Sequence, residues 1–140
     1  MLRDGQHRKV DLGWDYDLIR KLVAEHADCL NEVTQPVFIE WDLWDGTLPA
    51  FGPDGAGAKM RVFAGEQPGG PQETAWHRAR LAFERFAAAD LYLFSLPMWN
   101  AGIPYIAKQF IDVVSQPGMV FDFDPETGYT GLLGGRRATV

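Results

Sequence analysis

The chain is poor in cysteine and in long apolar runs, and it has no excess of positive charge. Its single cysteine, Cys29, has no partner in the chain for a disulfide bond, which favours a reducing compartment such as the cytoplasm. No apolar run approaches the roughly 18 residues that a membrane-spanning helix needs, so we predict no membrane partner. With 13 Lys and Arg against 19 Asp and Glu, the formal net charge is -6, which argues against a nucleic-acid partner.

Side chains that would form a metal site or a covalent acyl intermediate are also scarce. The 3 histidines, His7, His26 and His77, stand at no spacing typical of metal ligands. Ser95 and Ser115 lack the Gly-x-Ser-x-Gly context of a hydrolase nucleophile. We therefore expect no metal site and assign no catalytic side chain.

Length and composition fit one globular domain. At 140 residues, with 46% hydrophobic residues, the chain is long enough to bury a core. Residues 1–14 show no periodicity, and we expect them to form an irregular tail ahead of a single domain over 15–140. Apolar residues recur at helical spacing over 15–30, 73–90 and 103–114, and this pattern predicts three helices.

The inward faces of these helices follow from the same spacing. In the first helix they are Leu18, Leu22, Val23 and His26, and in the second they are Ala79, Ala82, Phe83 and Phe86. The third has the clearest stripe: Ile103, Ile106, Ala107, Phe110, Ile111 and Val114. Pro104 falls in its first turn, where the missing N–H costs nothing, and Lys108 and Asp112 face solvent.

Three segments have the composition of strands. PVFIEWDLW, residues 36–44, is rich in β-branched and aromatic residues, and LYLFS, residues 91–95, is typical of a fully buried parallel strand. RRATV, residues 136–140, opens another strand. A Gly/Pro-rich loop over 46–57 precedes a short helix near 58–66. Helices that alternate with strands predict an α/β fold with a parallel sheet.

The loop SLPMWNAGIP, residues 95–104, is too apolar for an ordinary surface turn. It joins a predicted strand to a predicted helix, the position at which open α/β sheets bind their ligands. Met98 and Trp99 could cover a planar ring, and Asn100 and the free amides could bond a heteroaromatic rim. The alternative is that Met98 and Trp99 plug the top of the sheet, which is the commoner use of such residues.

The amino-acid sequence of this region also resembles that of a known protein family. LPMWNAGIPYIAKQFID, residues 96–112, resembles the Pro-Met-aromatic-Asn loop and following helix of the FMN-dependent NAD(P)H oxidoreductases of flavodoxin-like fold, the azoreductase and quinone reductase family. Three more segments are similar to that family: DLWDGTLPAF (42–51), SQPGMVFDFDPETGYTGLL (115–133) and GGRRATV (134–140). The resemblance runs from about Leu18 to Val140.

The resemblance implies a flavodoxin-like, three-layer α/β/α fold with a parallel sheet, present in incomplete form. The family's first strand and Ser-rich phosphate loop are not matched, and Asp15 and Asp17 stand where hydroxyls are expected. Carboxylates there would repel a phosphate. The family's last elements would follow Val140. We therefore expect 15–140 to be a partial FMN-binding domain, truncated at both ends, with low stability and weak FMN affinity.

The resemblance also implies the site residues. FMN would rest on Pro97, Met98, Trp99, Asn100 and Ala101, held largely through backbone groups. The family commonly has Phe at the position of Ala101, so this residue is expected to contribute its backbone alone.

Phe121 matches a family aromatic that lies over the substrate pocket, often that of the partner subunit in a homodimer. Its spacing equally allows a core Phe that packs with Phe123.

The function implied is that of a cytoplasmic flavoprotein oxidoreductase. It would transfer hydride from NADH or NADPH through FMN to a quinone or azo compound. The alternative is a truncated, flavin-free homologue or interaction remnant without catalytic activity, which the missing phosphate loop favours. An NADPH-dependent FMN reductase fits the loop motif less well.

Overall fold

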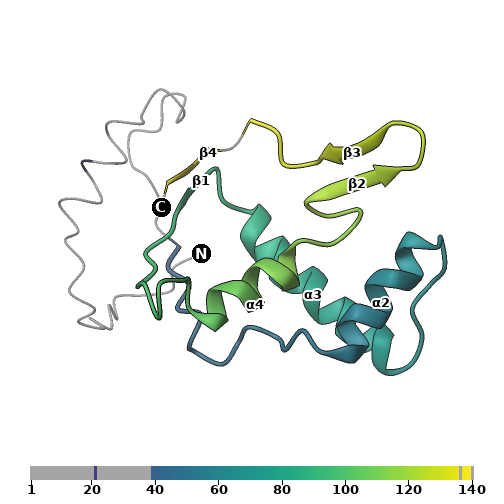
Figure 1. The fold of residues 1–140 in the computed structure, drawn as a ribbon, viewed down its shortest axis with the longest axis horizontal. Helices are drawn as coiled ribbons and strands as arrows, with labels where there is room; N and C mark the ends of the chain where they lie inside the picture. Colours follow the sequence, from purple (N-terminus) through teal and green to yellow (C-terminus); the bar gives the residue numbers. More distant parts are fainter. Residues whose placement is uncertain (1–20, 22–38, 136, 140) are drawn as a thin grey trace, which may run out of the picture. The chain divides into compact units, whose positions relative to one another are not determined.

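A computed structural model describes Lys21, residues 39–135 and residues 137–139 (Figure 1). Along the chain the elements are α2 (Pro53–Phe63), α3 (Pro71–Ala87), β1 (Leu91–Leu93), α4 (Tyr105–Val114), β2 (Phe121–Asp124), β3 (Gly128–Gly131) and β4 (Arg137–Thr139). The expected tail and the expected helix over 15–30 lie outside the described residues, apart from Lys21, which is helical. Among the described residues, no helix is both long enough and apolar enough to cross a membrane.

Helix α2 begins inside the segment expected to be a loop. Pro53 occupies the first turn, where its fixed φ suits a helix. Two glycines follow without breaking the helix, because there is little room for a side chain at either position. A Cβ on Gly55 would lie 3.0 Å from the Phe51 ring, and one on Gly57 would lie 2.6 Å from the Gln72 amide on α3. The loop prediction is therefore wrong from Pro53 onward, since close packing offsets the low helix propensity of glycine.

Helix α3 confirms the second predicted helix and its inward face. It begins at Pro71 and ends at Ala87, slightly before the expected end. Ala79 and Ala82 are buried, and the two phenylalanines of the predicted face are half-buried. α3 packs against both α2 and α4 and so lies at the centre of the helical layer (Figure 1).

Helix α4 confirms the third predicted helix, with a correction to its stripe. Ala107, Phe110 and Val114 are buried as predicted, and Ile106 is half-buried.

Ile103 and Ile111 are exposed, so the prediction for them is wrong, and Val113 is buried in their place. Ile103 precedes the first residue of the helix, and Val113 shares the face of Phe110, three residues earlier. On the polar side, Lys108 forms an ion pair with Asp112.

The core lies between α3, α4 and the segment that leads into α2. Its buried members are Leu48, Ala79, Ala82, Phe110, Val113 and Val114. Phe110 is the central ring: it meets Trp41 and Phe86 edge-on, each at 5.5 Å between ring centroids. Edge-to-face pairs of this kind stabilise a core beyond the area that they bury.

Strand β1 pairs with β4 in parallel, in the register Leu91↔Arg137 to Leu93↔Thr139. The parallel pairing and the strand near the end of the chain confirm the sequence prediction. The prediction that 91–95 is fully buried is wrong, because Leu91 and Tyr92 are half-buried and Leu93 is exposed. In the described part of the chain, β1 has one hydrogen-bonded neighbour, β4, which leaves its other edge uncovered there.

The strand predicted over 36–44 is wrong for the part that the structure describes, residues 39–44, where no strand forms. Asp42 starts a turn instead. Its side-chain Oδ1 accepts the Trp44 amide at 2.9 Å, and its carbonyl accepts the Asp45 amide at 3.1 Å. Local bonds from an Asp side chain compete with a strand ladder for the backbone, and here they prevail over β propensity.

Strands β2 and β3 form an antiparallel hairpin after α4, paired from Phe121↔Gly131 to Asp124↔Gly128. Its turn is capped by Asp124, whose Oδ1 accepts the amides of Glu126 and Thr127, each at 2.8 Å. Gly128 has φ 85°, the left-handed value that glycine adopts without strain.

Candidate functional site

The loop between β1 and α4 contains a tight two-residue turn. The Trp99 amide donates to the Gly102 carbonyl and the Gly102 amide donates to the Trp99 carbonyl, both at 2.9 Å. The two residues between them, Asn100 and Ala101, have φ 49° and 60°. A reciprocal bond pair around two positive-φ residues is the arrangement of a type I′ turn.

The turn is strained at its second position. Type I′ turns favour Asn-Gly, because glycine takes the left-handed conformation without a Cβ clash. Asn100 suits the first position, but the Cβ of Ala101 is in steric conflict with the backbone in this conformation. In the described part of the chain, these two are the residues other than glycine with positive φ. Strain of this kind concentrates at ligand-binding sites.

The turn leaves two adjacent donors unused. Over residues 39–135, no acceptor is paired with the backbone N–H of Asn100 or of Ala101. Both residues are exposed. An acceptor-bearing edge placed across this turn would receive two hydrogen bonds from neighbouring residues.

The apolar side chains of the loop are also exposed. Met98 is 79% exposed, Trp99 is 48% exposed, and Pro97 is exposed beside them. The alternative that Met98 and Trp99 plug the top of the sheet is therefore wrong. A contiguous apolar surface of this kind typically marks a binding site.

Trp99 belongs to an aromatic cluster of three rings: Trp44, Trp99 and Tyr105. The Trp44 and Trp99 ring centroids lie 5.7 Å apart with planes at 37°, and Trp44 meets Tyr105 edge-on at 5.2 Å. Trp44 is 50% exposed and Tyr105 is 66% exposed. The aromatic cluster extends the apolar surface of the loop.

Sequence reasoning missed Trp44 and Tyr105. The sequence pattern places Trp44 in a strand and Tyr105 in the third helix, and it indicates a site role for neither. One signal was available: Asp42 stands two residues before Trp44, the spacing at which an Asp side chain caps a turn. That spacing predicts a turn, but it does not predict which ring the turn brings beside Trp99.

Phe121 is not brought together with the loop. Its ring centroid lies 6.0 Å from that of Phe63 and 5.5 Å from that of Tyr129, and Lys59 Nζ lies 5.6 Å from its centre. Lys59 also donates to the Ser115 carbonyl at 2.9 Å, which places Phe121 near the C-terminal end of α4.

The loop joins the N-terminal end of that helix, roughly 15 Å away along a helix of this length (Figure 1).

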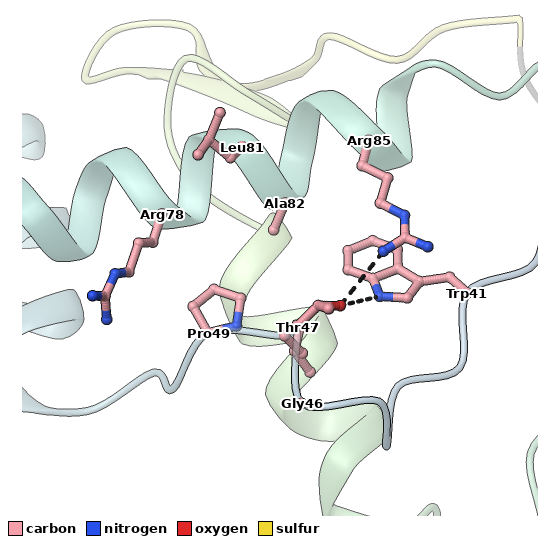
Figure 2. Close-up of a pocket in the computed structure, with 9 residues that line it drawn as sticks. Trp41, Gly46, Thr47, Pro49, Arg78, Leu81, Ala82 and Arg85 are labelled. Carbon is pink, nitrogen blue, oxygen red and sulfur yellow. Dashed lines mark hydrogen bonds between the residues drawn. The ribbon is translucent and has the colours of Figure 1, made fainter. Parts of the chain in front are cut away.

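Two pockets lie away from the loop. The first, of about 380 Å³, is lined by Trp41, Gly46, Thr47, Leu48, Pro49, Arg78, Leu81, Ala82 and Arg85 (Figure 2). The second, of about 390 Å³, lies between α2, α3 and residues 117–119. Neither of these two pockets is lined by a residue of 97–101. In the described part of the chain, no three His, Cys or carboxylate side chains gather closely enough to hold a metal ion.

Comparison with known proteins places this geometry in context. A family model described as flavodoxin-like fold matches residues 17–140. A Ruegeria pomeroyi protein named FMN-dependent NADH:quinone oxidoreductase is 50% identical over 99 residues, which are 71% of this chain and 48% of that protein. A Desulfotalea psychrophila protein of the same name is 43% identical over 99 residues, 71% of this chain and 47% of that protein. The chain thus spans about half the length of the curated relatives it matches.

Solved structures agree on the fold. An azoreductase from Bacillus anthracis superposes with a TM-score of 0.66 at 23% identity, over 96% of this chain and 62% of that chain. A Bacillus anthracis FMN-dependent NADH-azoreductase in complex with FMN superposes with a TM-score of 0.63 at 23% identity, over 91% and 60% of the two chains. At this identity the likeness shows the fold alone.

Proposed function

This chain belongs to the flavodoxin-like fold family, and on that premise we propose that it serves an FMN-dependent oxidoreductase. The reaction transfers hydride from NADH or NADPH by way of the flavin to a quinone or azo compound. The names of the Ruegeria and Desulfotalea relatives support this reaction class. A cytoplasmic location belongs to the proposal and is supported by the single Cys29.

The observation that carries the proposal is the pair of unused amides at Asn100 and Ala101. The pyrimidine edge of a flavin ring carries nitrogen and carbonyl acceptors side by side, which suits two adjacent donors. Ala101 contributes its backbone alone. Pro97 and Met98 offer an apolar surface, and Trp99 offers a ring edge next to the donors. The donor set and its surroundings thus fit the flavin ring.

These residues bind and orient; none of them needs to act as an acid or a base. When bound, FMN supplies the hydride-accepting centre, and the protein determines its position and surroundings. Two backbone bonds from Asn100 and Ala101 would hold the ring in one orientation. Trp99 and Met98 would exclude water from the part of the ring that they contact.

The phosphate end of FMN is assigned to no described residue. Asp15 and Asp17, which replace the family's hydroxyls, lie outside the described residues. We keep the division into a tail of 1–14 and an FMN-binding domain of 15–140 as part of the proposal.

A second copy of the chain belongs to the proposal as well. Because Phe121 lies at the opposite end of α4 from the loop, it is poorly placed to cover the flavin of its own chain. In a homodimer, Phe121 of one copy would cover the substrate side of the other copy's flavin. The oligomeric state, measured by analytical ultracentrifugation with and without FMN, tests this part.

The central test compares FMN with riboflavin, which lacks the phosphate. Each is titrated into the purified chain while flavin fluorescence is followed. Because the described contacts address the ring, we expect both to bind and to be quenched beside Trp99. Met98→Ala should weaken both, whereas Met60→Ala, a methionine that is also exposed but lies on α2, should weaken neither.

Two outcomes count against the proposal. Failure of both flavins to bind supports the flavin-free homologue instead. Binding that Met98→Ala leaves unchanged places the ring elsewhere on the chain. If flavin binds, oxidation of NADH and NADPH with a quinone and with an azo dye then tests the reaction itself.

A further inference from the structure

Trp44 lies against the motif tryptophan although the two come from distant parts of the chain. Its ring centroid is 5.7 Å from that of Trp99, and the ring planes are inclined by 37°. Rings at this distance and tilt attract each other through their edges and faces. Trp44 is thus the direct neighbour of the one aromatic side chain in the proposed flavin loop.

The backbone that carries Trp44 is held by a compact set of hydrogen bonds. Asp42 Oδ1 accepts the Trp44 amide at 2.9 Å. One residue further, Asp45 Oδ1 accepts both the Thr47 amide at 2.7 Å and the Thr47 hydroxyl at 2.6 Å. These two bonds from Thr47, the hydroxyl bond first, hold the pKa of Asp45 below its ordinary value. Trp44 therefore sits between two capped turns.

This segment is anchored in turn to helix α3. The Thr47 hydroxyl accepts a bond from Trp41 Nε1 at 3.2 Å and a longer one from Arg85 at 3.5 Å (Figure 2). The Arg85 guanidinium lies 4.2 Å from the centre of the Trp41 ring and donates to the Glu40 carbonyl at 3.2 Å. Cation–π contact and hydrogen bonds together fix the segment to the helix.

The two tryptophans thus differ in how they are held. Trp44 stands on a segment bound to α3, whereas Trp99 stands on an exposed turn strained at Ala101. Tyr105, the first residue of α4, meets Trp44 edge-on. The Trp99 backbone is bonded within its own turn, whereas the Trp44 segment is bonded to α3.

We infer that Trp44 is a positioning residue for the proposed flavin site: it holds the Trp99 ring at the angle at which the loop receives a flat, fused ring. The inference rests on the proposed function. It adds that the segment before α2, and not the Pro-Met-Trp-Asn loop alone, determines how tightly flavin binds. Trp44 acts through Trp99 and takes no part in the chemistry.

The test uses Trp44→Ala, Trp44→Phe and the control Met60→Ala in the full chain. Without flavin, Trp44→Ala and Trp99→Ala should each remove the same exciton-coupled circular dichroism of the indole pair. With riboflavin as the probe, Trp44→Ala should weaken binding by roughly two- to tenfold, the range that loss of one aromatic pair predicts, while Trp44→Phe restores most of the affinity. Bound flavin at saturation should be less quenched in Trp44→Ala than in Met60→Ala.

The outcomes separate the two claims. If the wild-type chain binds no flavin, the proposed function fails and this inference fails with it. If the wild-type chain binds flavin and Trp44→Ala binds it equally well with equal quenching, the inference alone is overturned. Loss of affinity that Trp44→Phe does not restore also overturns it, because a ring at this position would then not be what matters.

Discussion

Two turns of this chain both contain residues in the left-handed conformation, but they differ in residue type and in hydrogen bonding. The hairpin turn at Asp124 places Gly128 at the left-handed position, and the Asp124 side chain accepts three bonds from Glu126 and Thr127. The turn between β1 and α4 places Asn100 and Ala101 at left-handed positions and leaves their amides unused. The hairpin turn is therefore stabilised by its side-chain hydrogen bonds, whereas the turn at Asn100 and Ala101 is strained.

The difference extends to the neighbouring side chains. The hairpin turn carries Asp, Pro, Glu and Thr, the polar residues expected where a turn meets water. The other turn is flanked by Met98 and Trp99, both largely uncovered. A turn that is strained, apolar and rich in free donors is what a binding loop requires, so the contrast supports the assignment of the loop as the site. Four changes test that contrast.

The largest effect should come from Phe110→Ala, which removes the central ring of the core. Phe110 is buried and meets Trp41 and Phe86 edge-on. We expect the free energy of unfolding in urea to fall by about 3–5 kcal/mol. Phe123→Ala, on the exposed side of the hairpin, should cost much less, and equal losses would contradict the assignment of Phe110 as the central ring.

Gly128→Ala should come next, because it forces a Cβ into the left-handed conformation. With φ at 85°, the substitution should destabilise the chain by about 1–2 kcal/mol in urea unfolding. Gly131→Ala is the matched control in the same hairpin, since that glycine has no positive φ and an added Cβ meets nothing within 4 Å. Similar losses at both positions would show that the hairpin turn does not depend on glycine.

Ala101→Gly should act in the opposite direction. It relieves the strain in the loop and should raise the free energy of unfolding by up to about 1 kcal/mol. Ala50→Gly, an exposed loop position without positive φ, should lower it slightly because the unfolded chain gains freedom. A loss of stability in Ala101→Gly would remove the basis for calling this turn strained.

The smallest effect concerns pH and Asp124. Bonds from the Thr127 amide, the Glu126 amide and the Thr127 hydroxyl hold the pKa of Asp124 below its ordinary value of 3.8. A carboxylate with a lowered pKa stabilises the folded chain above pH 3.8, and this contribution is lost as the pH falls through the lowered pKa.

Asp124→Asn should therefore be slightly less stable than wild type at pH 7, and the gap in urea unfolding should narrow as the pH falls below 3.8. Asp122→Asn, whose parent side chain accepts one backbone bond, serves as the control. A gap between Asp124→Asn and wild type that widens on acidification would show that the sign of the pKa argument is wrong.

The sequence predicts α3 and α4 well because their signals are local. The apolar residues of α3 and α4 recur every three or four positions, the spacing that places them on one face of a helix. The strand prediction is wrong over 39–44, the part that the structure describes, because β propensity reflects the packing of side chains on a sheet more than it reflects the backbone. One Asp side chain, at position 42, was enough to redirect that segment into a turn.

The place of the loop between β1 and α4 was predictable from the sequence, but its conformation was not. The Met98–Asn100 motif located the loop, and its apolar character indicated a binding role. That Ala101 would take a left-handed conformation was not predictable, since alanine rarely does so. The contact between Trp44 and Trp99 depends on tertiary packing through Arg85 and Trp41, which no local pattern encodes.

The parallel pairing of β1 with β4 has a consequence for the order in which the chain folds. The β2–β3 hairpin and the α2–α3 pair join residues that are near each other in sequence. Such contacts form quickly, within microseconds for a hairpin. Residues Leu91 and Arg137 are far apart in sequence, so their ladder must wait for a large loop to close. The loop that contains Trp99 and Asn100 follows β1. Its placement beside the β1–β4 pair is therefore completed late in folding, and during synthesis only after β4 has left the ribosome.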